Sequence, residues 1–141
     1  MNDADDGRDE GLAEAFWSVA RRLRHLTHET LEPIGITPGQ SRAVAVLMRH
    51  GVMRLSELSD HLRIAPRSTT EVVDGLQERG LVERRPDPAD RRATLVALTD
   101  AGQATAEAIR TARHAEAERF FANLDDDDRA TLARILKTLK S

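Results

Sequence analysis

The sequence predicts a mainly helical fold that carries one small β-hairpin. Two observations lead to this prediction. Apolar residues recur at spacings of three and four positions through most of the chain, which is typical of amphipathic helices. One stretch, PDPADRRATLVALT at residues 86–99, instead passes from turn-forming residues into the alternation of a β-strand. We therefore expect a helical protein in which a single hairpin interrupts the series of helices.

Composition restricts the classes of protein to which this chain can belong. With 141 residues, 40% of them hydrophobic and 32% charged, the chain suits one soluble globular domain. No run of apolar residues approaches the ~18 that a membrane span needs, and the acidic start MNDADDGRDEG does not resemble a secretory signal. The absence of cysteine excludes thiolate nucleophiles and thiol-based redox sensing. We expect a cytoplasmic protein, since a chain without cysteine suits a reducing compartment.

The formal net charge of −3 hides an uneven distribution of charge. Residues 1–10 contain five acidic side chains and one arginine, whereas the remaining chain carries 20 basic and 19 acidic side chains. We expect this acidic N-terminus, residues 1–10, to be disordered. Only Lys137 and Lys140 are lysine, so the cationic chemistry of the body is that of arginine. Net charge neither identifies nor excludes a nucleic-acid partner, and the positions of the arginines decide the question.

Two helices are expected in the first third of the chain. The first spans about residues 12–31. Its apolar stripe consists of Leu12, Phe16, Val19, Leu23 and Leu26. Pro33 and Gly35 end this helix. The second helix begins after Thr37, because a proline follows this threonine and Gln40 stands three positions later, which is the pattern of a capping box.

Two further helices are separated by a tight joint. Ser56 is the predicted N-cap of a short helix, ELSDHL. Only residues 63–65 separate this helix from the next one. In that next helix Pro66 takes the first helical position and Gly80 marks the C-terminal end. Two short helices joined in this way predict a helix-turn-helix.

A hairpin follows the second of these helices immediately. Residues 81–85 (LVERR) form its first strand, PDPAD its turn and residues 94–98 its second strand. Thr99 then caps a long helix, and the acidic run 125–128 opens a last helix, where the helix dipole favours carboxylates. A helix-turn-helix followed at once by a hairpin is the winged-helix arrangement. We therefore predict a winged helix-turn-helix lobe over residues 37–99.

A lobe of this kind points to double-stranded DNA as the partner. The second helix places its N-terminal end in the major groove, where base edges differ, while the hairpin reaches toward the neighbouring minor groove. In that position Arg67 donates two hydrogen bonds to guanine, and the hydroxyls of Ser68 and Thr70 face bases or phosphates. Ser56 meets a phosphate at the start of the preceding helix. If only the two helices are considered, these residues are explained equally well as ordinary helix caps and surface side chains.

The lobe also resembles a known family. The run IAPRSTTEVVDGLQERGLVERRPDPADRRATLVALTDAG, residues 64–102, looks like the DNA-binding lobe of the MarR (multiple antibiotic resistance regulator) family of bacterial transcription regulators. The most diagnostic element is the wing, where the family's Asp-x-Arg stands as Asp90, Arg91 and Arg92. Leu98-Thr99 and Gly102 follow it, as in the family. One departure is a missing serine at position 65, where alanine removes one backbone contact to DNA.

The resemblance assigns roles to the residues of the wing. It implies that Arg92 enters the minor groove and that Arg91 contacts a phosphate. It also implies that Asp90 braces the wing through a nearby arginine, for which Arg85 is the candidate.

The resemblance further implies a function for the two ends of the chain. Residues 11–36 and 100–141 form a helical dimerisation region, and the resulting homodimer binds a pseudo-palindromic operator. More apolar surface lies on these helices than a small lobe can bury, which favours the dimer over the alternative of an intramolecular helical core. The family implies a repressor that a small aromatic or phenolic effector relieves. Trp17 and His25 are the candidate effector contacts, although Trp17 suits a dimer core equally well.

A metal-responsive regulator is one alternative. HLTHETLE places His25 and His28 three positions apart, with Glu29 and Glu32 following, and this spacing can put ligands on one helical face. A solvated polar face explains the same pattern, and we expect neither a metal nor another cofactor.

Two other classes of protein fit less well. The chain has no GxSxG, no glycine-rich phosphate loop and no cysteine nucleophile, so we expect that it is not an enzyme. A helical protein-protein adaptor without DNA binding shares the amphipathic ends. The function of such an adaptor does not explain why an Asp-Arg-Arg sequence stands at the tip of a hairpin.

Overall fold

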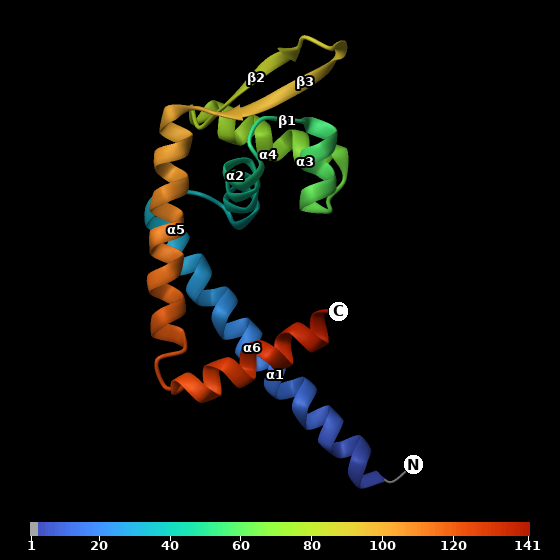
Figure 1. Ribbon diagram of the computed structural model, residues 1–141, viewed down its shortest axis with the longest axis vertical. Helices are drawn as coiled ribbons and strands as arrows, with labels where there is room; N and C mark the ends of the chain where they lie inside the picture. The colour runs from blue at the N-terminus through green and yellow to red at the C-terminus, as the bar shows by residue number, and fades with distance from the viewer. Residues whose placement is uncertain (1–2) are drawn as a thin grey trace.

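The structure is a computed structural model that describes residues 3–141, with side chains described from residue 7 onward. The chain is mainly helical and carries a small antiparallel sheet, which confirms the predicted fold class (Figure 1). The elements are α1 (Asp3–Leu31), the 3-10 helix η1 (Glu32–Ile34), α2 (Pro38–His50), β1 (Met53–Arg54), α3 (Leu55–Leu62), α4 (Pro66–Glu78), β2 (Val82–Asp87), β3 (Asp90–Leu98), α5 (Asp100–Phe120) and α6 (Asp126–Lys140). None of the described helices is long and apolar enough to span a membrane.

The sheet has three strands in the order β1-β3-β2. Sequence analysis predicted only the hairpin of β2 and β3 and assigned no strand to residues 53–54, because two residues cannot show an alternation. The hairpin is also longer than predicted: Pro86 and Asp87 lie in β2, and Asp87 pairs with Asp90 across a two-residue tip. Proline is tolerated there because β2 is an edge strand.

The core of the lobe lies between α2, α3, α4 and the sheet. Its largest fully buried side chains include Val44, Leu58, Leu62, Val73, Leu76 and Val96. These residues come from each of the helices of the lobe and from the central strand, so that the sheet and the helix-turn-helix share one apolar centre. The hairpin extends from this centre and is exposed toward its tip (Figure 1).

Local capping signals largely set the helix boundaries. The N–H of Gln40 donates to Thr37 Oγ1 at 3.1 Å, and the N–H of Thr37 donates to Gln40 Oε1 at 3.2 Å, which confirms the predicted capping box. The prediction that Ser56 caps α3 is wrong. The helix starts at Leu55, two residues earlier than predicted, and the N–H of its N-cap residue Arg54 donates to Glu57 Oε1 at 3.3 Å, so Ser56 lies inside the first turn.

The helix α1 is longer than the sequence predicts. It begins at Asp3, so residues 3–10, for which disorder is predicted, are helical, while residues 1–2 lie outside the described residues. Acidic side chains near the N-terminus of a helix are stabilised by its dipole, which gives a physical reason for the extension.

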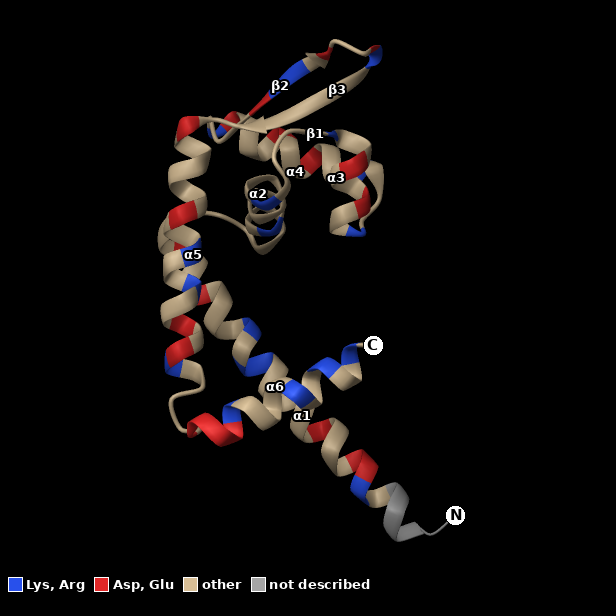
Figure 2. Cartoon of the chain, viewed as in Figure 1, with Lys and Arg blue, Asp and Glu red and all other residues tan. Residues whose placement is uncertain are grey.

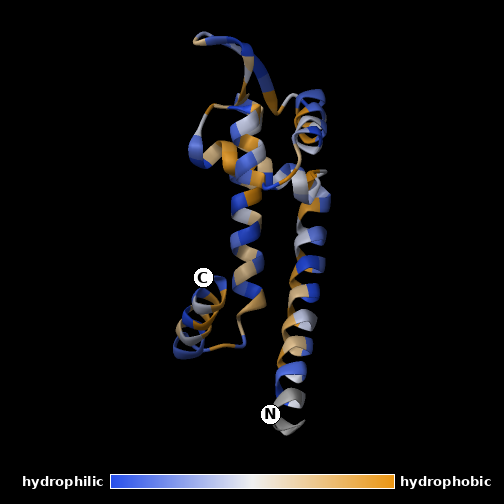
Figure 3. Cartoon of the chain, turned by 90° about the vertical axis from the view of Figure 1, so that its right-hand side faces the viewer, coloured by the Kyte–Doolittle hydropathy of each residue, from blue (hydrophilic) through white to orange (hydrophobic). Residues whose placement is uncertain are grey.

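The terminal helices leave a large apolar surface uncovered. Leu12, Phe16 and Val19 of α1 are 69%, 52% and 53% exposed, and Leu139 of α6 is 69% exposed. Part of α1 packs against α5, where the hydroxyl of Thr27 lies 2.8 Å from Glu116 Oε1, whereas α6 turns away from the end of α5 and contains no buried residue (Figure 3). These helices therefore stand apart from the lobe with much of their hydrophobic surface in solvent.

Candidate nucleic-acid interface

The joint between α3 and α4 fixes the direction of α4. Arg63 ends α3 in the left-handed region, with φ of 54°, and its N–H donates to Asp60 O at 3.3 Å. The hydroxyl of Thr69 donates to Ser59 Oγ at 3.0 Å, and the hydroxyl of Ser59 donates to Ile64 O at 2.9 Å. Thr69 and Ser59 are both buried, so this chain of hydrogen bonds is protected from water. The two helices form the predicted helix-turn-helix.

The N-terminal turn of α4 presents the side chains that are predicted to read bases. Arg67, Ser68 and Thr70 are all exposed. The hydroxyl of Thr70 donates to Pro66 O at 3.0 Å, so it offers DNA an acceptor rather than a donor. In the described part of the chain, Arg67 has no ion-pair partner. Ser56 is exposed in the first turn of α3, a position that keeps its hydroxyl accessible to a phosphate.

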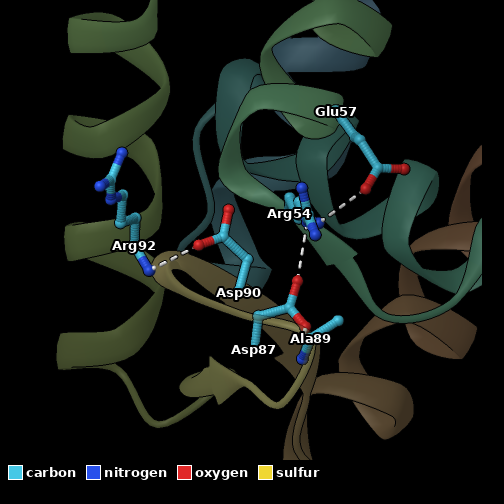
Figure 4. A network of polar contacts seen from close by, with 6 residues as sticks. All are labelled: Arg54, Glu57, Asp87, Ala89, Asp90 and Arg92. Carbon is cyan, nitrogen blue, oxygen red and sulfur yellow. Dashed lines mark hydrogen bonds and ion pairs between the residues drawn. The ribbon is translucent and has the colours of Figure 1, made fainter.

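The tip of the hairpin carries the two arginines of the wing. Arg91 and Arg92 are exposed at the start of β3, and the tip stands out as a basic point in Figure 2. The backbone N–H of Arg92 donates to Asp90 Oδ1 at 3.0 Å (Figure 4). Among the described residues neither guanidinium forms an ion pair. Both cationic groups are therefore available to an anionic partner.

The side chain that braces the wing differs from the one predicted. Asp87 is 8% exposed and accepts hydrogen bonds from Arg54 Nε at 2.7 Å and from the N–H of Ala89 at 2.8 Å (Figure 4). Arg85 instead pairs with Glu83 of its own strand, so the predicted brace between Asp90 and Arg85 is wrong.

The physical reason for this correction is the register of the hairpin. Asp87 comes just before the tip and is the buried one of the two aspartates, whereas Asp90 turns its carboxylate onto the backbone of its own strand. Arg54 lies on the short strand β1, far away in sequence, and no local motif marks it. The proximity of Asp87 to the Asp-x-Arg sequence was the one signal that could have found this brace.

The pKa of Asp87 is lowered from its ordinary value. The hydrogen bond from the N–H of Ala89 is the largest cause, partial burial opposes it, and the guanidinium of Arg54 lowers the pKa further. A carboxyl with a lowered folded-state pKa adds stability above its unfolded-state pKa, and this contribution disappears as pH falls through the folded-state value. The brace is therefore fully charged from weakly acidic pH upward.

A second contact fixes the hairpin to α4. Arg84 of β2 forms an ion pair with Asp74 at 2.5 Å and donates a further hydrogen bond to Gln77 Oε1. Arg84 and Arg54 thus attach the hairpin to α4 and to the start of α3. In Figure 1 the N-terminus of α4 and the tip of the hairpin lie on the side of the lobe away from α5. The helix-turn-helix and the wing consequently form one rigid surface.

The candidate effector and metal residues lie elsewhere, on α1. Trp17 is 56% exposed and packs edge-on against Phe16, with ring centroids 6.3 Å apart. His25 Nε2 lies 3.2 Å from Glu29 Oε1 on the exposed face of the helix. Neither Trp17 nor His25 lines a principal cavity of the described chain. The described residues also contain no group of three His, Asp or Glu side chains arranged to hold a metal ion.

A cavity of about 480 Å³ lies between α2 of the lobe and the long helix α5, beside the point where the two helices pack together. Its apolar wall includes Val44, Met48 and Ile109, and three guanidinium groups line it as well, those of Arg49, Arg110 and Arg113. Ser41 also lines the cavity, and its buried hydroxyl has no hydrogen-bond partner within the described residues. Apolar walls, cationic side chains and an unused hydroxyl suit a small aromatic anion.

Comparison with known proteins supports the assignment of this surface to DNA. A sequence model described as "MarR family" matches residues 36–94, which include the helix-turn-helix and the tip of the wing. The HTH-type transcriptional repressor MdtR of Bacillus subtilis is 30% identical over 111 residues, which cover 79% of this chain and 72% of MdtR.

Solved structures show the same architecture. A mutant of MarR from E. coli, crystallised in complex with operator DNA, has a TM-score of 0.80 and 29% identity over 92% of this chain and 93% of that chain. BpsR of Bordetella bronchiseptica, whose DNA binding is regulated by 6-hydroxynicotinic acid, has a TM-score of 0.78, with 93% of this chain and 99% of that chain covered. At 22% identity this second likeness shows the fold alone.

Proposed function

The chain belongs to the MarR family of DNA-binding transcription regulators, and on this premise we propose how its own residues serve that function. A homodimer in the cytoplasm represses transcription by binding a pseudo-palindromic operator, and a small aromatic acid relieves the repression. The protein is a regulator and not an enzyme.

The DNA-binding assignment depends on one observation: exposed arginines stand both at the start of α4 and at the tip of the wing. Arg67 at the start of α4 and Arg91 and Arg92 at the tip of the hairpin are exposed and have no ion-pair partner among the described residues. The hairpin is attached to both helices of the helix-turn-helix, so these cations keep a constant spacing. Arg67 reads a guanine in the major groove while Arg92 enters the adjacent minor groove. Arg91, Ser56, Ser68 and Thr70 contact phosphates or bases beside them.

The homodimer follows from the uncovered apolar surface of the terminal helices. Leu12, Phe16 and Val19 of α1 and Leu139 of α6 are more than half exposed. A groove of about 430 Å³ between α5 and α6 adds Phe121, Leu132 and Leu136 to this surface. Exposed apolar surface of this extent marks a protein interface. A two-fold dimer places two identical lobes on one duplex and therefore reads a pseudo-palindrome.

DNA binding can be tested by its dependence on salt. Bound sequences are first selected from a random double-stranded DNA library, and their affinity is then measured by fluorescence anisotropy at several salt concentrations. Because the arginines replace counterions on phosphates, we expect the logarithm of the association constant to fall with the logarithm of salt concentration, by about 0.9 per neutralised phosphate. A flat response and no selected sequence would support the protein-protein adaptor instead.

The cavity between α2 and α5 is the proposed effector site. Its three arginines attract a carboxylate, its apolar wall accepts an aromatic ring, and the hydroxyl of Ser41 is unused. Its position between the lobe and α5 means that an occupant changes how the lobe is held relative to the terminal helices. Such a change alters the spacing of the two α4 helices in the dimer and weakens operator binding. Trp17 and His25, the effector contacts expected from the sequence, lie on α1 and do not line this cavity, and their role stays a prediction.

The effector proposal predicts release of DNA by aromatic acids. We expect salicylic acid or 6-hydroxynicotinic acid at millimolar concentration to reduce operator affinity, and the neutral analogue benzamide to have no such effect. The double variant Arg110→Ala and Arg113→Ala should need about tenfold more acid for the same release, because it removes two charge-assisted contacts. Arg134→Ala, on α6 and outside the cavity, is the matched control. Equal release of DNA in the double variant and in the control would contradict the assignment.

A further inference from the structure

The first two turns of α4, residues 66–72, carry a carboxylate that the proposed DNA contacts do not use. Glu71 is exposed there, four positions after Arg67, so the two side chains lie on the same face of the helix. An acid beside an arginine that reads a base is unexpected, because the phosphates of DNA repel it. The position of Glu71 therefore needs an explanation in terms of the bases and not of the DNA backbone.

The protein itself does not neutralise Glu71. Arg67 and Glu71 have the spacing that allows an ion pair on a helix, yet they form none, and no other described residue pairs with Glu71. The two other acids of α4 are in different situations. Asp74 forms an ion pair with Arg84 of the wing at 2.5 Å, and Glu78 is the last residue of the helix. Glu71 is therefore the one carboxylate of α4 that is both unpaired and close to the N-terminal end.

The hydrogen-bonding chemistry of a carboxylate restricts which base can satisfy it. An ionised carboxylate accepts hydrogen bonds and donates none. In the major groove, donors are offered only by the N4 amino group of cytosine and the N6 amino group of adenine. Guanine and thymine present acceptors there, and adenine presents its N7 acceptor beside the amino group. Cytosine is therefore the base that meets Glu71 without placing a second lone pair against it.

We propose that Glu71 selects a cytosine in each half-site by accepting a hydrogen bond from the N4 amino group of that base. This inference rests on the proposed binding of DNA by α4 and adds a base preference beyond that of Arg67. At about 1.5 Å of rise per residue, the two side chains stand about 6 Å apart along the helix axis. The cytosine consequently lies within about two base-pair steps of the guanine that Arg67 reads, since one step measures about 3.4 Å.

Glu71 also acts against sequences that lack this cytosine. At any other base its carboxylate loses water without gaining a full partner, and it stays close to negative phosphates. Removal of the carboxylate should therefore have two effects of opposite sign. Binding to unrelated DNA becomes stronger, while the preference for one base of the operator becomes weaker. A residue that only supported the fold would instead weaken binding to both kinds of DNA when it is replaced.

Fluorescence anisotropy with full-length variants and defined duplexes tests this inference. The operator is selected from a random double-stranded DNA library with the unaltered chain, and each base pair of a half-site is then replaced by the other three. In Glu71→Ala we expect the preference for cytosine at one position to fall about tenfold, and the affinity for a duplex of scrambled sequence to rise about threefold. Glu71→Gln should move the preference at that position from cytosine to adenine, because glutamine pairs with N6 and N7 of adenine.

Glu78→Ala is the matched control, because it removes the same charge from an exposed position of the same helix, farther from the N-terminal end. It should leave every base preference unchanged, and far-ultraviolet circular dichroism should show full helix content in each variant. If Glu71→Ala keeps the cytosine preference, or weakens binding to all duplexes equally, Glu71 does not read a base, while selection of an operator by the unaltered chain still supports DNA binding. If the unaltered chain selects no sequence, the DNA-binding function and this inference fail together.

Discussion

Replacing Arg92 with alanine is expected to weaken operator binding by about tenfold to a hundredfold, equivalent to about 1–3 kcal/mol. The side chain is exposed at the tip of the hairpin, and no described residue forms an ion pair with it. Its guanidinium therefore gives up no internal contact when it enters the minor groove. Its backbone N–H is already held by Asp90 Oδ1 at 3.0 Å, and alanine keeps that bond. The loss should come from the contact with DNA and not from a distorted wing.

Fluorescence anisotropy with the selected operator measures this loss. Arg85→Ala is a suitable control on the same hairpin, because Arg85 is engaged by Glu83 and lies farther from the tip. Arg91→Ala should weaken binding to all sequences and reduce the salt slope by about one. Arg67→Ala should instead relax base preference at one position of each half-site. Operator affinity unchanged by Arg92→Ala, with the dimer intact, would show that the wing does not enter the groove.

The rigidity of the wing determines whether Arg92 can reach its groove. Asp87 accepts from Arg54 Nε at 2.7 Å and from the N–H of Ala89 at 2.8 Å, and Arg84 reaches Asp74 at 2.5 Å. A two-stranded hairpin without such contacts is marginally stable in water. The brace holds the tip at one distance from α4, so that binding does not have to fix a mobile hairpin.

The parts of the fold that depend on adjacent residues were predicted from the sequence. The capping box of Thr37 and Gln40, the caps at Thr99 and Asp125, and the stop at Gly80 are encoded within a few positions, and all are confirmed. The strand β1 was missed because its partner residues on β3 lie some forty positions away and its own two residues show no pattern. Long-range pairing of this kind depends on how the whole lobe packs, and the residues adjacent to β1 in the sequence do not indicate it.

The same distinction applies to the site. Arg67 and Arg92 stand next to recognisable turns, and both are exposed, as a contact with DNA requires. The brace needed Arg54 and Asp87, which come together only because β1 pairs with β3. The effector cavity combines Ser41 of α2 with arginines of α5, a combination that depends on how two distant helices pack. Sequence analysis placed the effector contacts on α1 instead, because an aromatic and a histidine two turns apart were the visible local pattern.

Replacing Gly102 with alanine is expected to destabilise the fold by about 3 kcal/mol or more. Gly102 lies in the first turn of α5, and a Cβ atom built there would come within 1.9 Å of Leu81 O. That carbonyl cannot easily move, because it accepts from the N–H of Thr99 at 3.1 Å. The hydroxyl of Thr99 in turn donates to Gly80 O at 2.6 Å and accepts from the N–H of Gly102 at 3.0 Å. These contacts join the first turn of α5 to the base of the hairpin.

Thermal unfolding followed by circular dichroism measures this effect, and a loss of about 3 kcal/mol corresponds to a fall in Tm of roughly 10 °C for a chain of this size. Gly39→Ala is a matched control, since Gly39 also lies in the first turn of a helix. A Cβ atom there would meet only Val72 Cγ2 at 3.8 Å, an ordinary contact. That variant should be neutral or slightly more stable, by up to about 1 kcal/mol, because alanine restricts the unfolded chain. If both variants melted at the same temperature, the close packing of α5 against Leu81 would be disproved, and with it the rigid base on which the wing stands.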